Sequence, residues 1–223
     1  IGIYAVINSN SQSKKQLEEN STNIEGTTNT ENSAKENKDE NIQNNQISNE
    51  SEENNMYSTG KHHAEIVVKN YGTIALELDS DVAPITVENF ANLVNEGFYN
   101  GLTFHRIISG FMIQGGDPLG NGTGGSSKTI KGEFASNGVK NSISHVRGTI
   151  SMARSSMPNS ASSQFFIVHQ DSTFLDGKYA AFGTVTSGME VVDKICADTA
   201  VEDDNGTVAK NNQPVIEKIT IID

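Results

Sequence analysis

The sequence predicts a mainly β domain, a closed barrel or sandwich with helical caps, behind a disordered tail. Three observations lead to this prediction. Short stretches of alternating apolar residues recur with turn signals between them, as in barrels and sandwiches. Two helical patterns stand apart instead of alternating with the strands, which argues against a parallel α/β sheet. Residues 1–60 are rich in Asn, Glu, Ser, Thr and Gln and show no sustained apolar period.

A segment with the composition of residues 1–60 cannot bury enough apolar surface to offset the entropy of ordering it. We therefore divide the chain into a disordered acidic tether, 1–60, and one domain, 61–223. The domain holds all four prolines and about 160 residues, enough for one stable core. Residues 1–7 are apolar but too few to span a bilayer. We interpret them as the remnant of a membrane anchor or signal segment, with a processed or arbitrary end as the alternative.

The elements of the domain follow from local patterns. A β-hairpin is expected over residues 64–78, where apolar residues alternate on both arms. A helix is expected over 84–96, with proline in its first turn and Gly97 as a left-handed C-terminal cap. A second helix is expected over about 188–196. Further strands are expected at 104–108, 148–153, 164–168, 179–185 and 215–222.

Composition narrows the classes of function. The net charge is −12 and no basic stripe is present, so we expect no nucleic-acid partner. The single cysteine, Cys196, excludes an intramolecular disulfide and a cysteine metal cluster, and the five histidines lack metal-ligand spacing. Residues 120–125 fit G-x-G-x-x-G, but neither the strand before them nor the helix after them that a dinucleotide site needs is predicted. We interpret this loop as the wall of a surface groove.

The chemistry centres on residues 104–117. Arg106 has a permanent charge and a planar fork of donors, and Gln114 can both donate and accept hydrogen bonds. Phe111 and Met112 can wall an apolar slot, one rigid and one adaptable. Taken singly, each of these residues is most often structural. Together they suit a neutral amide substrate better than a bond that requires a nucleophile.

The joint pattern resembles the cyclophilin family of peptidyl-prolyl isomerases, in its bacterial-like form. The resemblance runs in order from about residue 64 to 222 and leaves only the N-terminal tail uncovered. Six blocks carry it: FHRII at 104–108, GFMIQGGD at 110–117, NGTGG at 121–125, GTISMA at 148–153, SQFFI at 163–167 and FLDG at 174–177.

The resemblance implies a closed eight-stranded antiparallel β-barrel capped by two α-helices. It implies rotation about Xaa-Pro bonds without a cofactor, a metal or a covalent intermediate. By this likeness Arg106, Phe111 and Gln114 are catalytic, with Arg106 donating to the proline nitrogen of the twisted transition state. The residues that it places in the substrate groove are His105, Met112, Thr123, Ala153, Arg154, Gln164, Phe166, Phe174, Leu175 and Tyr179.

Three positions depart from many members of the family. Phe174 replaces a tryptophan, which removes an indole donor, so we expect at most weak binding of cyclosporin-type inhibitors. Tyr179 replaces a frequent histidine and keeps an aromatic wall with a polar tip. Arg154 replaces a common asparagine beside a loop about one residue longer than usual.

We therefore expect a monomeric peptidyl-prolyl cis-trans isomerase that assists folding, acting on proline-containing peptides and unfolded protein clients. The main alternative is a proline-groove binding module or holdase with incidental turnover. A further alternative is recruitment of partners by the tail. We expect an extracytoplasmic, membrane-tethered placement in a bacterium, with a cytoplasmic placement as the alternative.

Overall fold

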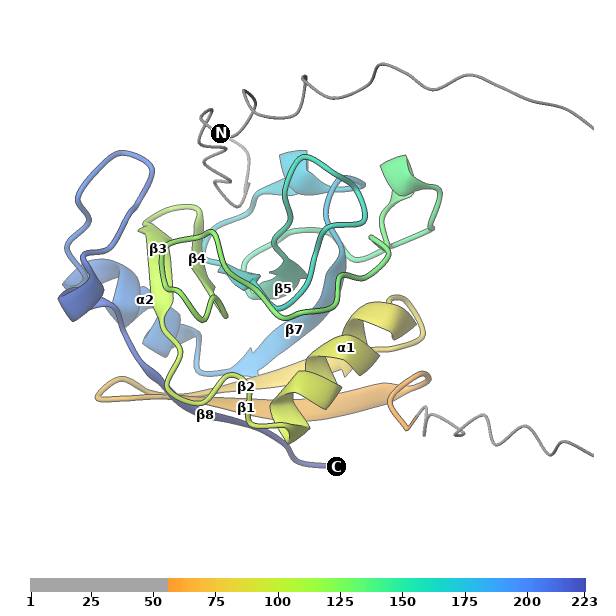
Figure 1. Ribbon diagram of the computed structural model, residues 1–223, viewed down its shortest axis with the longest axis horizontal. Coiled ribbons are helices and arrows are strands. Elements are labelled where there is room, and N and C mark those ends of the chain that lie inside the picture. Colours follow the sequence, from red (N-terminus) through yellow and green to blue (C-terminus); the bar gives the residue numbers. More distant parts are fainter. Residues whose placement is uncertain (1–55) are drawn as a thin grey trace, which may run out of the picture. The chain divides into compact units, whose positions relative to one another are not determined.

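The protein was analysed as a computed structural model that describes residues 56–223 (Figure 1). Residues 1–55, with most of the expected tether and the apolar run 1–7, lie outside the described residues. Within residues 56–223 there are two α-helices, α1 (Pro84–Asn95) and α2 (Met189–Asp198). The strands are β1 (Lys61–Val68), β2 (Gly72–Asp79), β3 (Phe104–Ile108), β4 (Met112–Gly115), β5 (Thr149–Met152), β6 (Phe165–Val168), β7 (Ala181–Ser187) and β8 (Ile216–Ile221).

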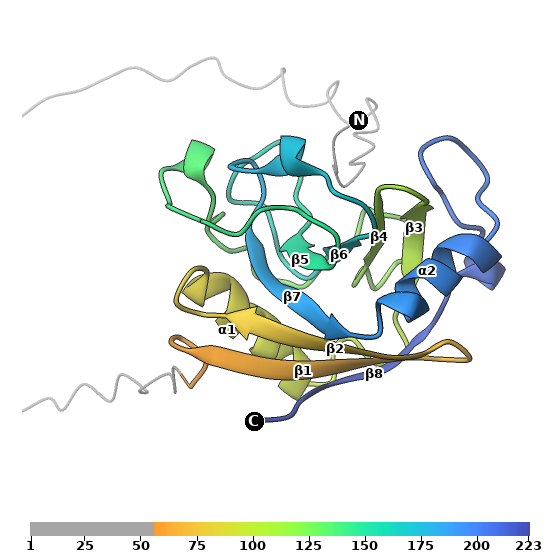
Figure 2. The same ribbon diagram turned by 180° about the vertical axis from the view of Figure 1, so that it is seen from behind.

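The eight strands form one antiparallel sheet in the order β3-β4-β6-β5-β7-β2-β1-β8. The sheet curves into a half-barrel, and Figures 1 and 2 show α1 and α2 on opposite sides of it. The mainly β fold with two helices is confirmed. Helix α1 packs against β2 and β8, and α2 packs against β2.

Full closure of the barrel was expected and is not matched, because no strand ladder joins the edges β3 and β8. The edges meet only near their ends. An isolated bridge joins Thr103 and Val215, the Phe104 N–H donates to the Pro214 carbonyl (2.9 Å), and Ile216 exchanges backbone bonds with Gly101 and Leu102 (2.8 Å each). Two features limit the pairing. Pro214 has no N–H to donate, and β3 beyond its first residue pairs with a loop instead, through the N–H of Ile107 and the carbonyl of Gly206 (2.8 Å).

Helix α1 starts at the predicted proline but lacks a capping side chain of its own, since Ala83 is its N-cap. The buried carboxylate of Glu133 replaces that cap from a distant loop. It accepts the N–H groups of Ile85 (3.2 Å) and Thr86 (2.8 Å), two of the donors that a helix start leaves free. Gly97 has φ of 70° after the helix, the left-handed conformation expected of it.

One strand, β4, was missed by the pattern analysis. All four of its residues are buried, so no alternation of apolar and polar residues marks it. The two faces of the strand nevertheless contact different groups of side chains. Ile113 belongs to the main core inside the sheet, whereas Met112 belongs to a second apolar cluster. That second cluster marks the face on which the predicted site residues lie.

A β-bulge in β3 decides which face Arg106 occupies. Phe104 pairs with Gly115 and Arg106 pairs with Gln114, so two steps along β3 match one step along β4. The extra residue changes the alternation: Phe104 and Ile107, three residues apart, both lie in the main core. Bulges re-aim side chains in this way. Arg106 is therefore placed beside Gln114 instead of facing the interior.

Candidate active site

The candidate site is built on one row of residues across four neighbouring strands. Arg106 on β3 pairs with Gln114 on β4, Gln114 pairs with Phe166 on β6, and Phe166 pairs with Ser151 on β5. The register thus brings together a cation, an amide and an aromatic ring from positions up to 60 residues apart in the sequence. The predicted neighbourhood of the two stretches 104–117 and 163–167 is confirmed.

Arg106 is held on three sides. Its Nη1 donates to Gln114 Oε1 (3.2 Å), its Nε to the carbonyl of Asn205 (2.8 Å), and its Nη2 to Asn205 Oδ1 (3.1 Å). The guanidinium is 6% exposed, and this burial lowers the pKa of Arg106. Each terminal nitrogen keeps one further N–H, for which no partner is found within residues 56–223. The guanidinium is therefore a fixed cation with N–H donors available to a ligand.

A chain of amides continues from Arg106 to the glycine-rich loop. Gln114 Nε2 donates to Gln164 Oε1 (2.9 Å), and Gln164 Nε2 donates to the carbonyls of Gly122 (3.2 Å) and Gly124 (2.7 Å). Every amide in this chain has its orientation set by its neighbours. The carbonyl oxygen of Gln114 is therefore the atom that faces the guanidinium.

The glycine-rich loop is shaped by Asp117, which is 1% exposed. Its carboxylate accepts the N–H groups of Leu119 (2.8 Å), Asn121 (3.0 Å) and Gly122 (2.6 Å). Burial raises the pKa of Asp117, but these bonds, with one from Gly124, outweigh it and leave the pKa below its ordinary value. Residues 119–122 of this loop line the cavity beside Arg106.

Beside the polar row lies the apolar slot. Its buried residues are Met112, Ala153, Phe166, Val168, Leu175 and Tyr179. The Tyr179 ring stands edge-on to Phe166, with centroids 6.0 Å apart. Phe111 is half-buried and stacks on Phe174, whose ring is 57% exposed, with centroids 5.6 Å apart. The two phenylalanines form the outer lip of the slot.

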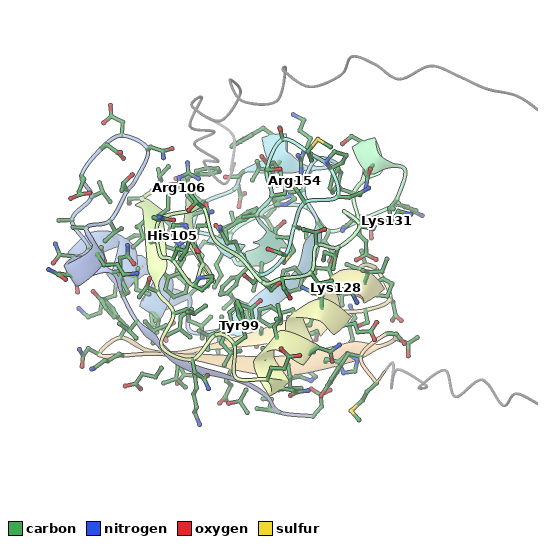
Figure 3. The ribbon with its side chains drawn as sticks, in the orientation of Figure 1. Tyr99, His105, Arg106, Lys128, Lys131 and Arg154 are labelled. Atoms are coloured by element: carbon green, nitrogen blue, oxygen red, sulfur yellow. The ribbon has the colours of Figure 1, made fainter. Side chains whose placement is uncertain are left out.

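His105 lies next to Arg106 on β3 (Figure 3) but is 4% exposed. Neither ring nitrogen has a hydrogen-bond partner within the described residues, and burial lowers the pKa of His105 to about 4. With Arg106 and Gln114 it lines a cavity of about 550 Å³. His105 is thus an uncharged wall of this cavity at neutral pH and not an exposed residue of the rim.

Thr123 and Arg154 lie at the rim, and Ala153 is buried in the slot. Thr123 is exposed and bonds to Asn121 Oδ1 through its N–H (3.0 Å) and its hydroxyl (2.7 Å). The N–H of Ala153 is used by the carbonyl of Gln164 (2.9 Å), so its own carbonyl is the group left for a ligand. Arg154, labelled in Figure 3, has its guanidinium 4.8 Å from the Tyr179 ring centroid and bonded to the carbonyl of Lys178 (2.9 Å). Its charge is bound within the protein.

Sequence reasoning missed two supporting residues. Asn205, which holds Arg106 at two atoms, lies in an acidic, Asn-rich loop with no motif to mark it. His145 stacks on Phe166 (6.0 Å, 15°) and bonds to Asp176 Oδ1 (2.8 Å) and Ser151 Oγ (3.0 Å). Burial lowers the pKa of His145, although Asp176 opposes this shift. The His145 ring thus supports the slot from behind.

Among residues 56–223, no group of three or more His, Cys, Asp or Glu is arranged to hold a metal ion. Cys196 is half-buried, and burial raises its pKa to about 12, which keeps the thiol protonated. In the same part of the chain, no helix is long and apolar enough to cross a membrane. A fixed cation beside an apolar slot is a site for a neutral amide with an apolar ring.

Comparison with known proteins agrees with this chemistry. The family described as "Cyclophilin type peptidyl-prolyl cis-trans isomerase/CLD" matches residues 63–222. A peptidyl-prolyl cis-trans isomerase of Helicobacter pylori is 51% identical over 128 residues, covering 56% of this chain and 76% of the relative. Peptidyl-prolyl cis-trans isomerase B of Bacillus subtilis is 50% identical over 117 residues, covering 52% and 78%. The chain therefore belongs to the cyclophilin family, whose activity is peptidyl-prolyl cis-trans isomerisation.

A solved structure adds a ligand to the comparison. The cyclophilin-type isomerase of Cryptosporidium parvum, crystallised in the presence of the dipeptide Ala-Pro, has a TM-score of 0.64 and 32% identity. The match covers 72% of this chain and 99% of that one. The enzyme activity and the family of the present chain are thus established by likeness along almost the whole domain.

Proposed function

We propose that this enzyme accelerates rotation about Xaa-Pro bonds by electrostatic stabilisation of the twisted amide through Arg106. The uncatalysed barrier is about 18–20 kcal/mol because the planar amide is stabilised by resonance. In the twisted state the resonance is lost and the proline nitrogen gains a lone pair. A donor that binds this lone pair stabilises the transition state more than the ground state, as catalysis requires.

One observation carries the proposal: a buried guanidinium, fixed by Gln114 and Asn205, lies beside the apolar slot and keeps unused N–H donors. In our proposal the proline ring enters the slot of Met112, Phe166 and Leu175, and Phe111 covers it at the lip. Each ~1.4 kcal/mol that Arg106 adds in the twisted state gives about tenfold in rate. Fixing the guanidinium beforehand avoids the cost of orienting it during the reaction.

The roles of the other groove residues follow from their positions. Gln114 orients Arg106, and Gln164 fixes Gln114 and the loop that carries Thr123. We assign the carbonyl of Ala153 to contact the substrate backbone, while Arg154, Tyr179 and Phe174 shape the edge of the groove. His105 closes the polar cavity beside Arg106 without a charge.

The test is the cis/trans exchange rate of a short Ala-Pro peptide, measured by NMR with the full 223-residue chain. Arg106→Ala is expected to lose about two powers of ten in kcat/KM, which corresponds to about 2.7 kcal/mol. Arg106→Lys is the matched control, because it keeps the charge but not the planar fork. Binding without accelerated exchange by the parent would favour the alternative, a proline-groove binding module or holdase.

The partners that fit this site are proline-containing segments of unfolded clients, whose folding the enzyme would assist. We propose that the chain acts as a monomer, does not bind nucleic acid, and binds cyclosporin-type inhibitors weakly, because Phe174 offers no indole N–H. Replacing Phe174 with Trp should raise inhibitor affinity, measured by isothermal titration calorimetry on parent and variant because the parent contains no tryptophan. An unchanged affinity would contradict this role of Phe174.

We also propose that residues 1–60 tether the domain at an extracytoplasmic membrane surface. The support is compositional: an apolar run at 1–7 followed by a polar, acidic stretch. Fractionation of cells that produce the natural protein tests this placement. Recovery of the protein entirely in the cytoplasmic fraction would overturn it and leave the cytoplasmic alternative.

A further inference from the structure

A second, smaller cleft of about 300 Å³ lies on the far side of the lip of the slot. Three apolar residues, Ile108, Phe111 and Phe174, line it together with two carboxylates, Asp171 and Asp204. It shares the lip residues Phe111 and Phe174 with the slot but none of the buried slot residues, and it does not include Arg106. The rotation step proposed above makes no use of it.

The apolar part of this cleft suits the stem and the charge of a long cationic side chain. Phe111 and Phe174 are stacked at 29°, and Phe174 is 57% exposed, so the pair offers an accessible apolar surface. The (CH₂) stem of lysine or arginine buries well along such a surface. The faces of the rings also attract a cation.

The two carboxylates come from separate segments of the chain. Asp171 follows β6 and accepts the N–H of Arg147 at Oδ1 (2.8 Å), which leaves its second oxygen for another donor. Asp204 lies in the loop after α2, and its side chain has no hydrogen bond or ion pair with any residue of 56–223. Glu202 and Asp203 precede it in the same loop and add to the negative charge.

The nearby cations do not neutralise the cleft. The guanidinium of Arg147 is bonded to Asp193 Oδ2 (2.8 Å) and to the carbonyl of His169 (2.8 Å). The ammonium of Lys178 keeps its charge, because its partner is the neutral carbonyl of Phe174 (3.0 Å), but the two carboxylates that line the cleft outnumber it. Neither residue lines the cleft. Charge complementarity therefore favours a positively charged occupant over a neutral or acidic one.

We propose that this cleft binds the side chain of a lysine or arginine that lies near the isomerised proline in the client segment. The inference rests on the proposed function, since a client whose proline occupies the slot passes the lip formed by Phe111 and Phe174. It adds a preference to that function: the enzyme turns over proline sites flanked by a basic residue faster than neutral or acidic ones.

The test compares peptides that differ at one position, scanned over the three residues on each side of proline. Each position carries lysine, norleucine or glutamate, so that norleucine keeps the apolar stem and loses only the charge. We expect one position at which kcat/KM for lysine exceeds that for norleucine by about 3- to 10-fold, the range of one or two exposed charge pairs. The ratio should fall toward one at about 500 mM salt.

The variant that tests the site is Asp171→Asn/Asp204→Asn, which removes both charges and keeps an oxygen for the Arg147 N–H. Its matched control is Glu96→Gln/Glu217→Gln, which removes two charges at exposed positions, one at the C-cap of α1 and one on β8. The lysine-to-norleucine ratio should collapse in the first variant and persist in the second. Equal ratios in both variants, or no preference in the parent, would overturn the inference.

The result is distinguishable from failure of the isomerase proposal itself. If the parent turns over the norleucine peptides and Arg106→Ala does not, the rotation mechanism stands whatever the lysine preference. If no peptide is turned over by the parent, the proposed function fails first.

Discussion

The two faces of β4 and β6 differ sharply in what their side chains do, although the residues alternate along the same strands. Ile113, Phe165 and Ile167 point into the main core. Met112 and Phe166 belong to the second cluster on the other face, where Gln114 meets Arg106. All of these residues are buried, so burial alone does not distinguish them. Alternate residues along each strand therefore serve different roles: one set stabilises the core, and the other set forms the site.

The largest effect is expected when one aromatic ring on each face is truncated, which tests whether the two faces contribute separately to stability and catalysis. Phe165 meets Phe90, Tyr99 and Phe104 edge-on, with centroid distances of 5.6–6.1 Å. Phe165→Ala should lower the free energy of unfolding by about 3–5 kcal/mol, with kcat/KM per folded molecule close to that of the parent. Phe166→Ala, the matched variant, should lower kcat/KM as well. Urea unfolding and NMR exchange measure the two quantities.

A collapse of turnover in folded Phe165→Ala would show that the faces are coupled. Turnover of both variants is measured without urea, at a temperature for which the unfolding curves give the folded fraction of each variant. The ratio of turnover to folded fraction then decides between separable and coupled faces.

The second prediction concerns His105, which the bulge places on the cavity side. Its pKa of about 4 in the folded protein lies below the ordinary 6.5 of an unfolded chain. As pH falls below about 6.5, the unfolded state therefore takes up the proton first, and stability decreases until about pH 4. The contribution lost over this window is about 3 kcal/mol.

Urea unfolding at several pH values between 7 and 4 measures this slope. His105→Phe removes the titrating group, so its slope should be shallower than that of the parent, whatever its absolute stability. The remaining slope would include His145, whose pKa is also lowered. Parallel slopes in parent and variant would contradict the buried, unpartnered state of the His105 ring.

Gln114→Ala should produce a smaller loss of stability and a clear loss of turnover. It leaves Arg106 Nη1 and Gln164 Oε1 without their partner, at a cost of about 1–3 kcal/mol. The guanidinium loses one of its three holds, and kcat/KM should fall by about tenfold or more. Ile113→Ala, one residue away on the opposite face, is the control: it should destabilise the fold and leave turnover per folded molecule unchanged.

The sequence predicts the elements that build the core better than it predicts the residues of the site face. Alternation, short apolar runs and turn residues predicted both helices and seven strands. They failed for β4, whose sequence Met-Ile-Gln-Gly is short, shows no alternation and ends in glycine. The bulge at His105 has no local signal, so only likeness to the family placed Arg106 on the groove side. Asn205 was missed because it lies about 100 residues after Arg106 in the sequence, and no pattern predicts that its loop folds back onto Arg106.

Asn205 provides the test with the smallest expected effect. It holds Arg106 on the site face but belongs to neither apolar cluster. Its side chain is exposed, and truncation should change the free energy of unfolding by less than about 0.5 kcal/mol. Asn205→Ala removes the acceptor of Arg106 Nη2 but keeps the carbonyl that binds Nε. We expect kcat/KM to fall by about 2- to 5-fold. The effect is small because the guanidinium loses one neutral hydrogen-bond acceptor and keeps its bonds to Gln114 and to the Asn205 carbonyl. Asn205→Asp retains an oxygen at the same place and should keep turnover near that of the parent in the NMR exchange assay. If the Ala variant keeps the turnover of the parent, the loop positions Arg106 through its backbone carbonyl alone.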